Sequence, residues 1–232
     1  MIEAPPTLIV NTARRRPTTA QIAALQNTPA GFVADALGGG GALERQIQPL
    51  GAGSDLSCTV AGPALTADCG PGDVLALFAA LKFVAPGDIV VAAFAAHSGC
   101  AAGGDALMGR LKNGGAAGFV TDGPLRDHDG IAAVGLPVWC AGLTPASPHM
   151  SGPGSIGFPV QIGGQQVGTG DMIVADRDGV VVVPFARLDE VIAKLVHIRA
   201  LEAQQDATIA GGEVAPPWVD DLLASDRTAY TD

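Results

Sequence analysis

Two neighbouring residues of opposite charge, Arg126 and Asp127, lie in a polar segment, 122–129, that follows a short apolar run. A guanidinium pairs well with an anionic oxygen, and a carboxylate can hold a hard divalent cation such as Mg²⁺ through one direct bond while waters fill the other positions. An ordinary ion pair in a surface turn would use the same two residues. The pattern therefore indicates either a site for an anion and a metal ion or a surface contact.

A second candidate begins at Gly104 and Asp105, directly before a stretch with helical character. We expect Asp105 to cap this helix and the backbone N–H groups of Ala106 and Leu107 to lack intrahelical partners. Such a helix start suits a small carboxylate. The alternative is that Asp105 is only a cap and the glycines before it only form a turn.

Other chemistry has less support in the sequence. His128 and Asp129 extend the first candidate and could suggest a softer metal, although a single histidine in a polar loop is more commonly solvated. The sequence contains no Gly-x-Ser-x-Gly elbow, phosphate-binding loop, dinucleotide fingerprint or Cys/His nucleophile pair. The sequence therefore does not support a serine hydrolase, a nucleotide phosphatase or an NAD enzyme.

The elements that must position these candidates alternate between strand and helix. Apolar runs over 89–96, 117–121 and 137–140 predict strands, and the residues from 106 to about 113 predict a short helix between the first two. This order is a βαβ crossover, so the strands are parallel. Both candidate loops then leave the carboxyl ends of parallel strands, which is the edge where open α/β sheets bind ligands.

The rest of the chain predicts elements of both kinds. The expected elements are a helix after a capping box at 18–21, a strand or hairpin over 58–66, a helix capped by Asp73, β-structure over 154–184 with a hairpin across 172–183, and a helix from Arg187 to about Thr208 followed by an extended tail around Trp218.

Composition limits the class of protein. The chain has 232 residues and 23.2 kDa, which predicts one globular unit, and 32 glycines with 17 prolines exclude long helical bundles. A formal charge of −10 disfavours a nucleic-acid partner, and we expect the basic run 14–16 to be a solvated cluster. The four cysteines form no CxxC pair and are expected to be reduced and mostly buried.

The first residues contain no basic segment followed by an apolar stretch, and the longest apolar runs are well short of the roughly 20 residues that span a bilayer. We therefore expect a cytoplasmic protein that does not bind membranes.

Three segments together resemble a known family. Residues 104–107, 118–127 and 135–139 are similar to the pattern G-D-x-L … G-x-V-x-D-G-x-x-R-D … G-x-P-V-[FW] of the RraA-like family. That family includes 4-hydroxy-4-methyl-2-oxoglutarate aldolases, which also decarboxylate oxaloacetate. Weaker similarity, over 35–37, 61–66, 179–184 and 215–219, extends the resemblance to most of the chain.

The resemblance implies a fold and an assembly. It implies a single-domain α/β sandwich of the swivelling β/β/α type over 1–232, with a mixed sheet and a long C-terminal helix. The N-terminal helical segment would cover about 18–45, the core about 55–185, and the C-terminal helix and tail about 186–232. The family assembles as trimers or hexamers with sites at subunit interfaces, so a homo-oligomer is expected.

The resemblance also implies roles for the residues of the two candidate loops. Arg126 would bind a small keto-acid substrate and stabilise the enolate oxygen. The amides of Ala106 and Leu107, presented by the turn at Gly104, would hold the pyruvate carboxylate. Asp105 would position a metal-bound water that carries protons.

The metal site is implied in the same way. Asp127 would ligate Mg²⁺ or Mn²⁺, and an acidic residue from the C-terminal helix of a neighbouring subunit would complete the site. Glu202 is the best match for that residue, on its position in the helix.

The expected function is a divalent-metal-dependent lyase that cleaves 4-hydroxy-2-oxo acids to pyruvate through an enolate and also decarboxylates oxaloacetate. The alternative is a non-catalytic RraA-type regulator that binds a partner such as an RNase E-like ribonuclease. The regulators that share the fold lack the aspartate after the arginine, whereas this chain keeps Asp105, Arg126 and Asp127. A related lyase that acts on another hydroxy acid is a third possibility that the sequence does not separate.

Overall fold

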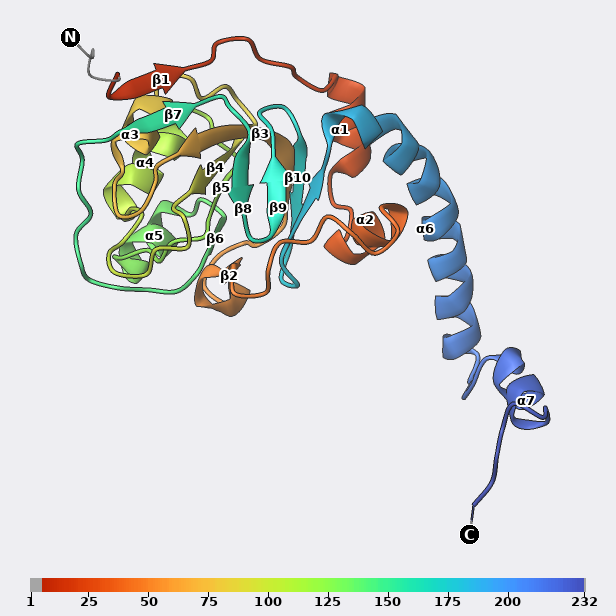
Figure 1. Ribbon diagram of the computed structural model, residues 1–232. Coiled ribbons are helices and arrows are strands. Elements are labelled where there is room, and N and C mark those ends of the chain that lie inside the picture. The colour runs from red at the N-terminus through yellow and green to blue at the C-terminus, as the bar shows by residue number, and fades with distance from the viewer. Residues whose placement is uncertain (1–5, 232) are drawn as a thin grey trace.

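The computed structural model describes residues 6–231 and contains short strands and helices (Figure 1). The strands are β1 (Leu8–Val10), β2 (Gln48–Pro49), β3 (Val60–Asp68), β4 (Ile89–Ala93), β5 (Gly118–Thr121), β6 (Val138–Cys140), β7 (Gly154–Ile156), β8 (Val160–Ile162), β9 (Gln165–Val167), β10 (Met172–Ala175) and β11 (Val180–Val183). The helices are α1 (Thr19–Leu25), α2 (Ala30–Ala36), α3 (Leu75–Ala80), α4 (Asp105–Asn113), α5 (His128–Val134), α6 (Leu188–Ala210) and α7 (Pro217–Leu223), with short 3₁₀ turns η1 (Leu50–Gly53) and η2 (Phe185–Arg187).

A mixed sheet forms the centre of the molecule. Its order is β1-β7-β3-β4-β5-β6-β2. Strands β4, β5 and β6 are parallel as the sequence predicts, and β3 is parallel to β4 as well. The long strand β3 also pairs antiparallel with β10, which continues into the hairpin partner β11. The crossover order therefore places the loops after β4, β5 and β6 at one edge of the sheet.

Alternating side chains of the central strands build the core on both faces of the sheet. In β4, Val90 and Ala92 join the cluster beneath α3, α4 and α5, whereas Ile89 and Val91 join the cluster shared with β10 and β11. All five residues of β4 are buried, as expected for a parallel strand covered on both faces.

The β10–β11 hairpin separates two clusters in the same way. Ile173 and Val182 face the parallel strands, whereas Val174 and Val181 face α1, α2 and α6. The layers are thus helices α3 to α5, the parallel strands, the hairpin, and helices α1, α2 and α6. This arrangement confirms the predicted mixed α/β fold with a mixed sheet and a long C-terminal helix.

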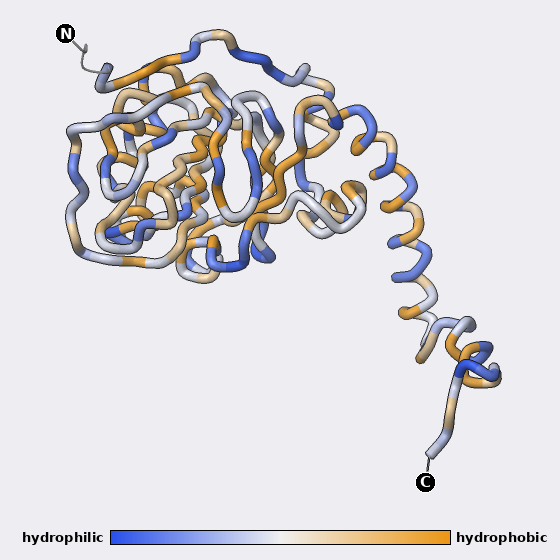
Figure 2. The backbone as a smooth tube through the Cα atoms, viewed as in Figure 1, coloured by the Kyte–Doolittle hydropathy of each residue, from blue (hydrophilic) through white to orange (hydrophobic). Residues whose placement is uncertain are grey.

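The C-terminal elements extend away from the rest of the molecule. The first half of α6 packs on α1 and α2, and its second half projects outward to α7 (Figure 1). The expectation of an extended tail around Trp218 is wrong, because Pro217 starts the helix α7, where a proline at the first helical position costs no hydrogen bond. In Figure 2, orange segments along the outer half of α6 and along α7 mark apolar residues. Trp218, in α7, is 62% exposed.

The basic run near the start is not a solvated cluster. Arg14 and Arg16 both form ion pairs with Asp88, and the Asp88 side chain is completely buried. A buried carboxylate is costly unless it is paired, so these contacts hold the N-terminal segment against the turn before β4. The four cysteines are free and buried, as expected. No helix within residues 6–231 combines the length and the apolar character needed to cross a membrane.

Candidate active site

Main-chain hydrogen bonds join the three loops at the carboxyl ends of β4, β5 and β6. The Arg126 N–H donates to the Gly103 carbonyl over 3.1 Å, which connects the loop after β5 to the loop after β4. The Leu125 N–H donates to Gly142 over 2.9 Å, and the Leu125 carbonyl accepts from Thr144 over 2.8 Å. The loops that carry the predicted residues therefore form one connected structure.

Arg126 and Asp127 lie together on this surface. Arg126 Nε is 3.3 Å from Asp127 Oδ2, and Arg126 Nη1 donates to Ser147 Oγ over 2.8 Å. Their side chains are 40% and 44% exposed, so both groups can be reached by a ligand. A β-carbon at Gly104 would overlap the Asp127 carboxylate, so a larger residue there would displace the Asp127 side chain.

The backbone of Asp127 has a left-handed conformation with φ 62° and ψ 48° at the N-cap of α5. Aspartate tolerates this conformation better than most residues. Its side chain makes no capping hydrogen bond, although its main-chain carbonyl accepts from Ile131. The Asp127 carboxylate therefore makes no hydrogen bond to the first turn of α5.

Asp105 lies against the same turn, but it is not the cap of its helix. The N-cap of α4 is Gly104, and Asp105 is the first helical residue. Asp105 Oδ1 accepts from the Ala106 N–H over 2.5 Å, and the Leu107 N–H donates to the Gly104 carbonyl over 3.1 Å. The expectation that both amides lack partners is therefore wrong. A β-carbon at Gly130 would touch the Asp105 carboxylate, which places Asp105 beside the start of α5.

His128 makes a contact that the sequence did not indicate. Its Nε2 is 3.2 Å from Asp55 Oδ2, and its Nδ1 is 3.0 Å from Asp129 Oδ1. Asp55 follows η1, so this contact brings a distant segment beside Arg126 and Asp127. No local pattern around Asp55 marks this pairing.

A hollow of about 380 Å³ opens at these residues. Its lining consists of Arg126, Asp127, His128, Leu143, Thr144 and Pro145. One side of the hollow is thus charged, and the other side, contributed by the loop after β6, is largely apolar.

Buried Asp122 fixes the loop after β4. It accepts hydrogen bonds from the N–H groups of Phe94, over 2.6 Å, and Ala96, over 2.8 Å. Burial raises the pKa of the Asp122 carboxyl, and these two bonds partly oppose that rise. Ala95 and Ala96 adopt left-handed conformations, so β4 ends at Ala93 rather than at residue 96 as the apolar run predicted.

Replacing Asp122 by alanine is expected to lower the free energy of unfolding by about 3 kcal/mol, because two backbone donors lose a charged acceptor. Urea denaturation measures this difference. The matched control is Asp178→Ala at an exposed hairpin position, where a change within about 0.5 kcal/mol is expected. Equal effects of the two substitutions would contradict this role for Asp122.

Asp73 anchors the other end of the loop that carries Leu143 and Ser147. Its carboxylate accepts from the N–H groups of Leu75, Ser151 and Gly152, over 2.7, 2.6 and 2.9 Å. Burial raises the pKa of Asp73, but the hydrogen bonds to the ionised form outweigh it and leave the pKa below the usual value.

A lowered folded-state pKa stabilises the protein above the unfolded-state pKa of about 3.9, and this contribution is lost as the pH falls through the folded value. Asp73→Asn should therefore cost about 2 kcal/mol at pH 7, and the difference from the wild type should shrink towards pH 3. Urea midpoints measured across this range test the expectation. A difference independent of pH would show that ionised Asp73 is not the stabilising group.

The carboxylate oxygens at this site suit a hard cation, such as Mg²⁺, that keeps most of its bound waters. Within residues 6–231, no three His, Cys, Asp or Glu side chains are placed to hold a metal ion together. Mg²⁺ commonly binds through only one or two carboxylates together with waters and substrate oxygens. The exposed Asp127 carboxylate, free of any capping bond, fits that requirement.

Glu202 does not join this site within one chain. It lies partly exposed on α6, and Figure 1 shows α6 on the opposite side of the molecule from α4 and α5. The structure therefore brings together Gly104, Asp105, Ala106, Leu107, Arg126 and Asp127, and leaves Glu202 apart.

The family model for RraA-like proteins, described as Aldolase/RraA, matches residues 30–182. The chain belongs to the RraA-like family. One relative, from Halalkalibacterium halodurans, is provisionally named 4-hydroxy-4-methyl-2-oxoglutarate aldolase and is 34% identical over 194 residues, which cover 84% of this chain and 90% of the relative.

Solved structures show the same fold. Streptomyces coelicolor RraAS2, described as an unusual member of the RNase ES inhibitor RraA protein family, has a TM-score of 0.71 and 30% identity, covering 83% of this chain and all of that chain. A Pseudomonas syringae protein has a TM-score of 0.74 at 21% identity, over 86% of this chain and 96% of that chain. At this lower identity the likeness concerns the fold alone.

Proposed function

We propose that this protein is a divalent-metal-dependent lyase that cleaves 4-hydroxy-2-oxo acids, of the 4-hydroxy-4-methyl-2-oxoglutarate type, to pyruvate through an enolate. Decarboxylation of oxaloacetate would be a related activity, since it passes through the same enolate. The observation that carries the proposal is the Arg126–Asp127 pair beside Asp105 at the carboxyl edge of the parallel strands. The similarity to relatives named as aldolases supports it.

Arg126 is the group that would stabilise the reaction's developing charge. Cleavage of the bond between C3 and C4 leaves an electron pair that moves onto the keto oxygen of the pyruvate half. The guanidinium, held by Ser147 and Asp127, is exposed and can donate to that oxygen. Fixed donors directed at a developing oxyanion commonly supply the largest part of such catalysis.

The start of α4 would hold the pyruvate carboxylate, and Asp105 at this helix start would take part in proton transfer. In the structure the Ala106 N–H is occupied by Asp105, so a bound carboxylate would displace the Asp105 side chain from that amide. The carboxylate would also approach the Leu107 N–H, beside Gly104. The released Asp105 could then orient a water that removes the proton from the 4-hydroxyl group and returns one to the enolate.

Asp127 would hold Mg²⁺ or Mn²⁺, which would supply positive charge to the enolate when bound. We propose that Glu202 of a neighbouring subunit completes this site in a homotrimer or homohexamer. The exposed apolar residues on α6 and α7, including Leu201 and Trp218, suit burial against another subunit.

A non-catalytic regulator is the second candidate, since RraAS2 is similar over its whole length. In that case the fold would bind a partner protein such as an RNase E-like ribonuclease. A regulator has no need of a carboxylate beside an arginine at the strand ends, so Asp105 and Asp127 favour the lyase. The formal charge of −10 favours a small-molecule substrate over nucleic acid.

Pyruvate release tests the lyase directly. The substrates are oxaloacetate and a panel of 4-hydroxy-2-oxo acids that includes 4-hydroxy-4-methyl-2-oxoglutarate, each with Mg²⁺ or with a chelator. Free metal ions decarboxylate oxaloacetate slowly, so the rate without enzyme is subtracted. We expect release that depends on the metal. No release from any acid, together with no Mg²⁺ binding, would favour the regulator.

A further inference from the structure

The loop after β6 brings Ser147 to the Arg126 side chain, and two prolines restrict this part of the loop. In the sequence Ser147 stands between Pro145 and Pro148. Proline fixes its own φ and limits the residue before it to extended conformations, so the main chain around Ser147 has little freedom. The hydroxyl oxygen of Ser147 accepts from Arg126 Nη1 over 2.8 Å.

Main-chain hydrogen bonds hold the loop on both sides of Ser147. On one side the Ala101 N–H donates to the Ala146 carbonyl over 2.9 Å, and on the other side the His149 N–H donates to the Gly72 carbonyl over 2.8 Å. Ala101 belongs to the loop after β4, and Gly72 lies between β3 and α3. The Ser147 hydroxyl is therefore carried by a main chain that two other segments hold in place.

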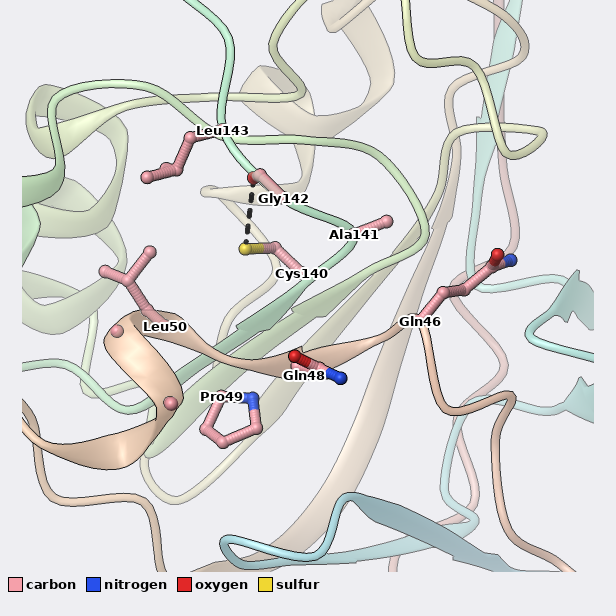
Figure 3. A pocket seen from close by; sticks show the side chains of 10 residues that line it. Gln46, Gln48, Pro49, Leu50, Cys140, Ala141, Gly142 and Leu143 are labelled. Atoms are coloured by element: carbon pink, nitrogen blue, oxygen red, sulfur yellow. Dashed lines mark hydrogen bonds between the residues drawn. The ribbon is translucent and has the colours of Figure 1, made fainter.

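The start of the same loop is also held, as Figure 3 shows. The Cys140 thiol donates to the Gly142 carbonyl over 3.4 Å. The hollow in Figure 3 has a volume of about 420 Å³ and is lined in part by Leu143, which also lines the hollow that contains Arg126. The loop after β6 thus borders both hollows at Leu143 and continues to Ser147 beside the Arg126 side chain.

The three nitrogens of the Arg126 guanidinium have different surroundings. Nε faces Asp127 Oδ2 at 3.3 Å, and Nη1 donates to Ser147. Among residues 6–231, Nη2 has no hydrogen-bond or ion-pair partner. Because Arg126 and Asp127 both line the hollow, Nη2 is the nitrogen left to donate to a ligand oxygen there.

Asp127 is the less permanent of the two partners of this guanidinium. In the proposed function its carboxylate holds Mg²⁺ or Mn²⁺, and a divalent cation competes with Arg126 for the same oxygens. The neutral hydroxyl of Ser147 is not drawn into this competition. When the metal is bound, Ser147 is therefore the contact that restrains the guanidinium.

We propose that Ser147 is a positioning residue for this reaction: its hydroxyl holds Nη1 and thereby keeps Nη2 of Arg126 available to the enolate oxygen. The inference rests on the proposed lyase function, in which Arg126 stabilises that oxygen. A donor stabilises a developing oxyanion best when it is held in place beforehand, because a mobile guanidinium must lose its freedom during the reaction. The hydrogen bond is exposed, so its contribution to folding is small and its effect should be seen in turnover.

Ser147→Ala should lower kcat for pyruvate release at least about tenfold and change KM by less than about threefold, because the hydrogen bond matters most when the oxyanion forms. The substrate is the 4-hydroxy-2-oxo acid that the wild type cleaves fastest. The affinity for Mn²⁺ and the urea midpoint should equal those of the wild type. Ser147→Thr keeps the hydroxyl and should keep kcat within about threefold. Ser57→Ala, which removes an exposed serine before β3, is the matched control and should not alter kcat.

The double variant Arg126→Ala/Ser147→Ala, assayed at raised enzyme concentration, separates positioning from an independent role. Because Ser147 acts through Arg126, its removal should cost less than about twofold once Arg126 is absent. An equal loss in both backgrounds would overturn the inference and leave the lyase standing, as would an unchanged kcat in Ser147→Ala. Weaker Mn²⁺ binding or a lower urea midpoint in Ser147→Ala would also overturn it, because Ser147 would then support the metal site or the fold. No pyruvate from any acid with the wild type would overturn both.

Discussion

Arg126→Ala is expected to lower kcat/KM for pyruvate formation by at least about 10²–10³-fold, the usual cost of removing one donor to a developing oxyanion. Arg126→Lys should recover only part of the loss, because an ammonium keeps the charge but not the planar fork that also contacts Ser147 and Asp127. Initial rates of pyruvate release, with thermal unfolding to verify the fold, measure both effects.

The matched control for Arg126 is Arg45→Ala, which removes an exposed arginine from the loop before β2. Its rate should stay within twofold of the wild type. If Arg126→Ala retained the wild-type rate in folded protein, the assignment of this residue to the enolate oxygen would be wrong.

Asp127→Asn is expected to lower the affinity for Mn²⁺ at least about tenfold and turnover at least about 10²-fold, because the amide keeps the shape of the side chain but removes the anionic ligand. Electron paramagnetic resonance of free Mn²⁺ measures binding without reference to activity. Gly104 leaves room for a side chain of this size at position 127, so the fold should tolerate the change.

Asp178→Asn on the exposed β10–β11 turn is the matched control for this charge change. It should leave both the Mn²⁺ affinity and the rate unaltered. Undiminished Mn²⁺ binding by the Asp127 variant would place the metal elsewhere. Undiminished turnover would show that the reaction does not need a metal ion held by Asp127.

The layout of the sheet edge that carries the candidate site was predictable because strong local patterns specify it. The unbroken apolar runs at β4 and β5, with a helix between them, require parallel strands whose carboxyl ends share one edge. The capping box at Thr18 likewise fixes the start of α1. These features depend on residues close together in the sequence.

Contacts between distant short segments were not predictable in the same way. β1 pairs with β7 through three residues on each side, and neither segment has a pattern that identifies the other. The pairing of Asp55 with His128 and the burial of Asp88 under Arg14 depend on the tertiary fold. A charge run or a single histidine is compatible with solvent exposure until the packing is known.

The sequence predicted which residues of the two candidate loops lie near one another, but only part of their hydrogen bonds. Main-chain bonds join the two loops, so Arg126 and Asp127 lie beside the turn at Gly104 that precedes Asp105. The amide of Ala106 is occupied by Asp105, a local hydrogen bond that competes with the expected free helix start. The role of Glu202 stays a prediction, since it concerns a neighbouring subunit.

Exchange of the methyl protons of pyruvate with deuterium in D₂O, followed by proton NMR, tests the central claim most directly, because it reports formation of the enolate without any carbonyl half. We expect exchange with Mg²⁺ well above the rate without protein, and its loss with chelator, in Arg126→Ala and in Asp127→Asn. Exchange at the rate without protein, in folded protein that binds Mg²⁺, would contradict the assignment of this chain as a pyruvate lyase.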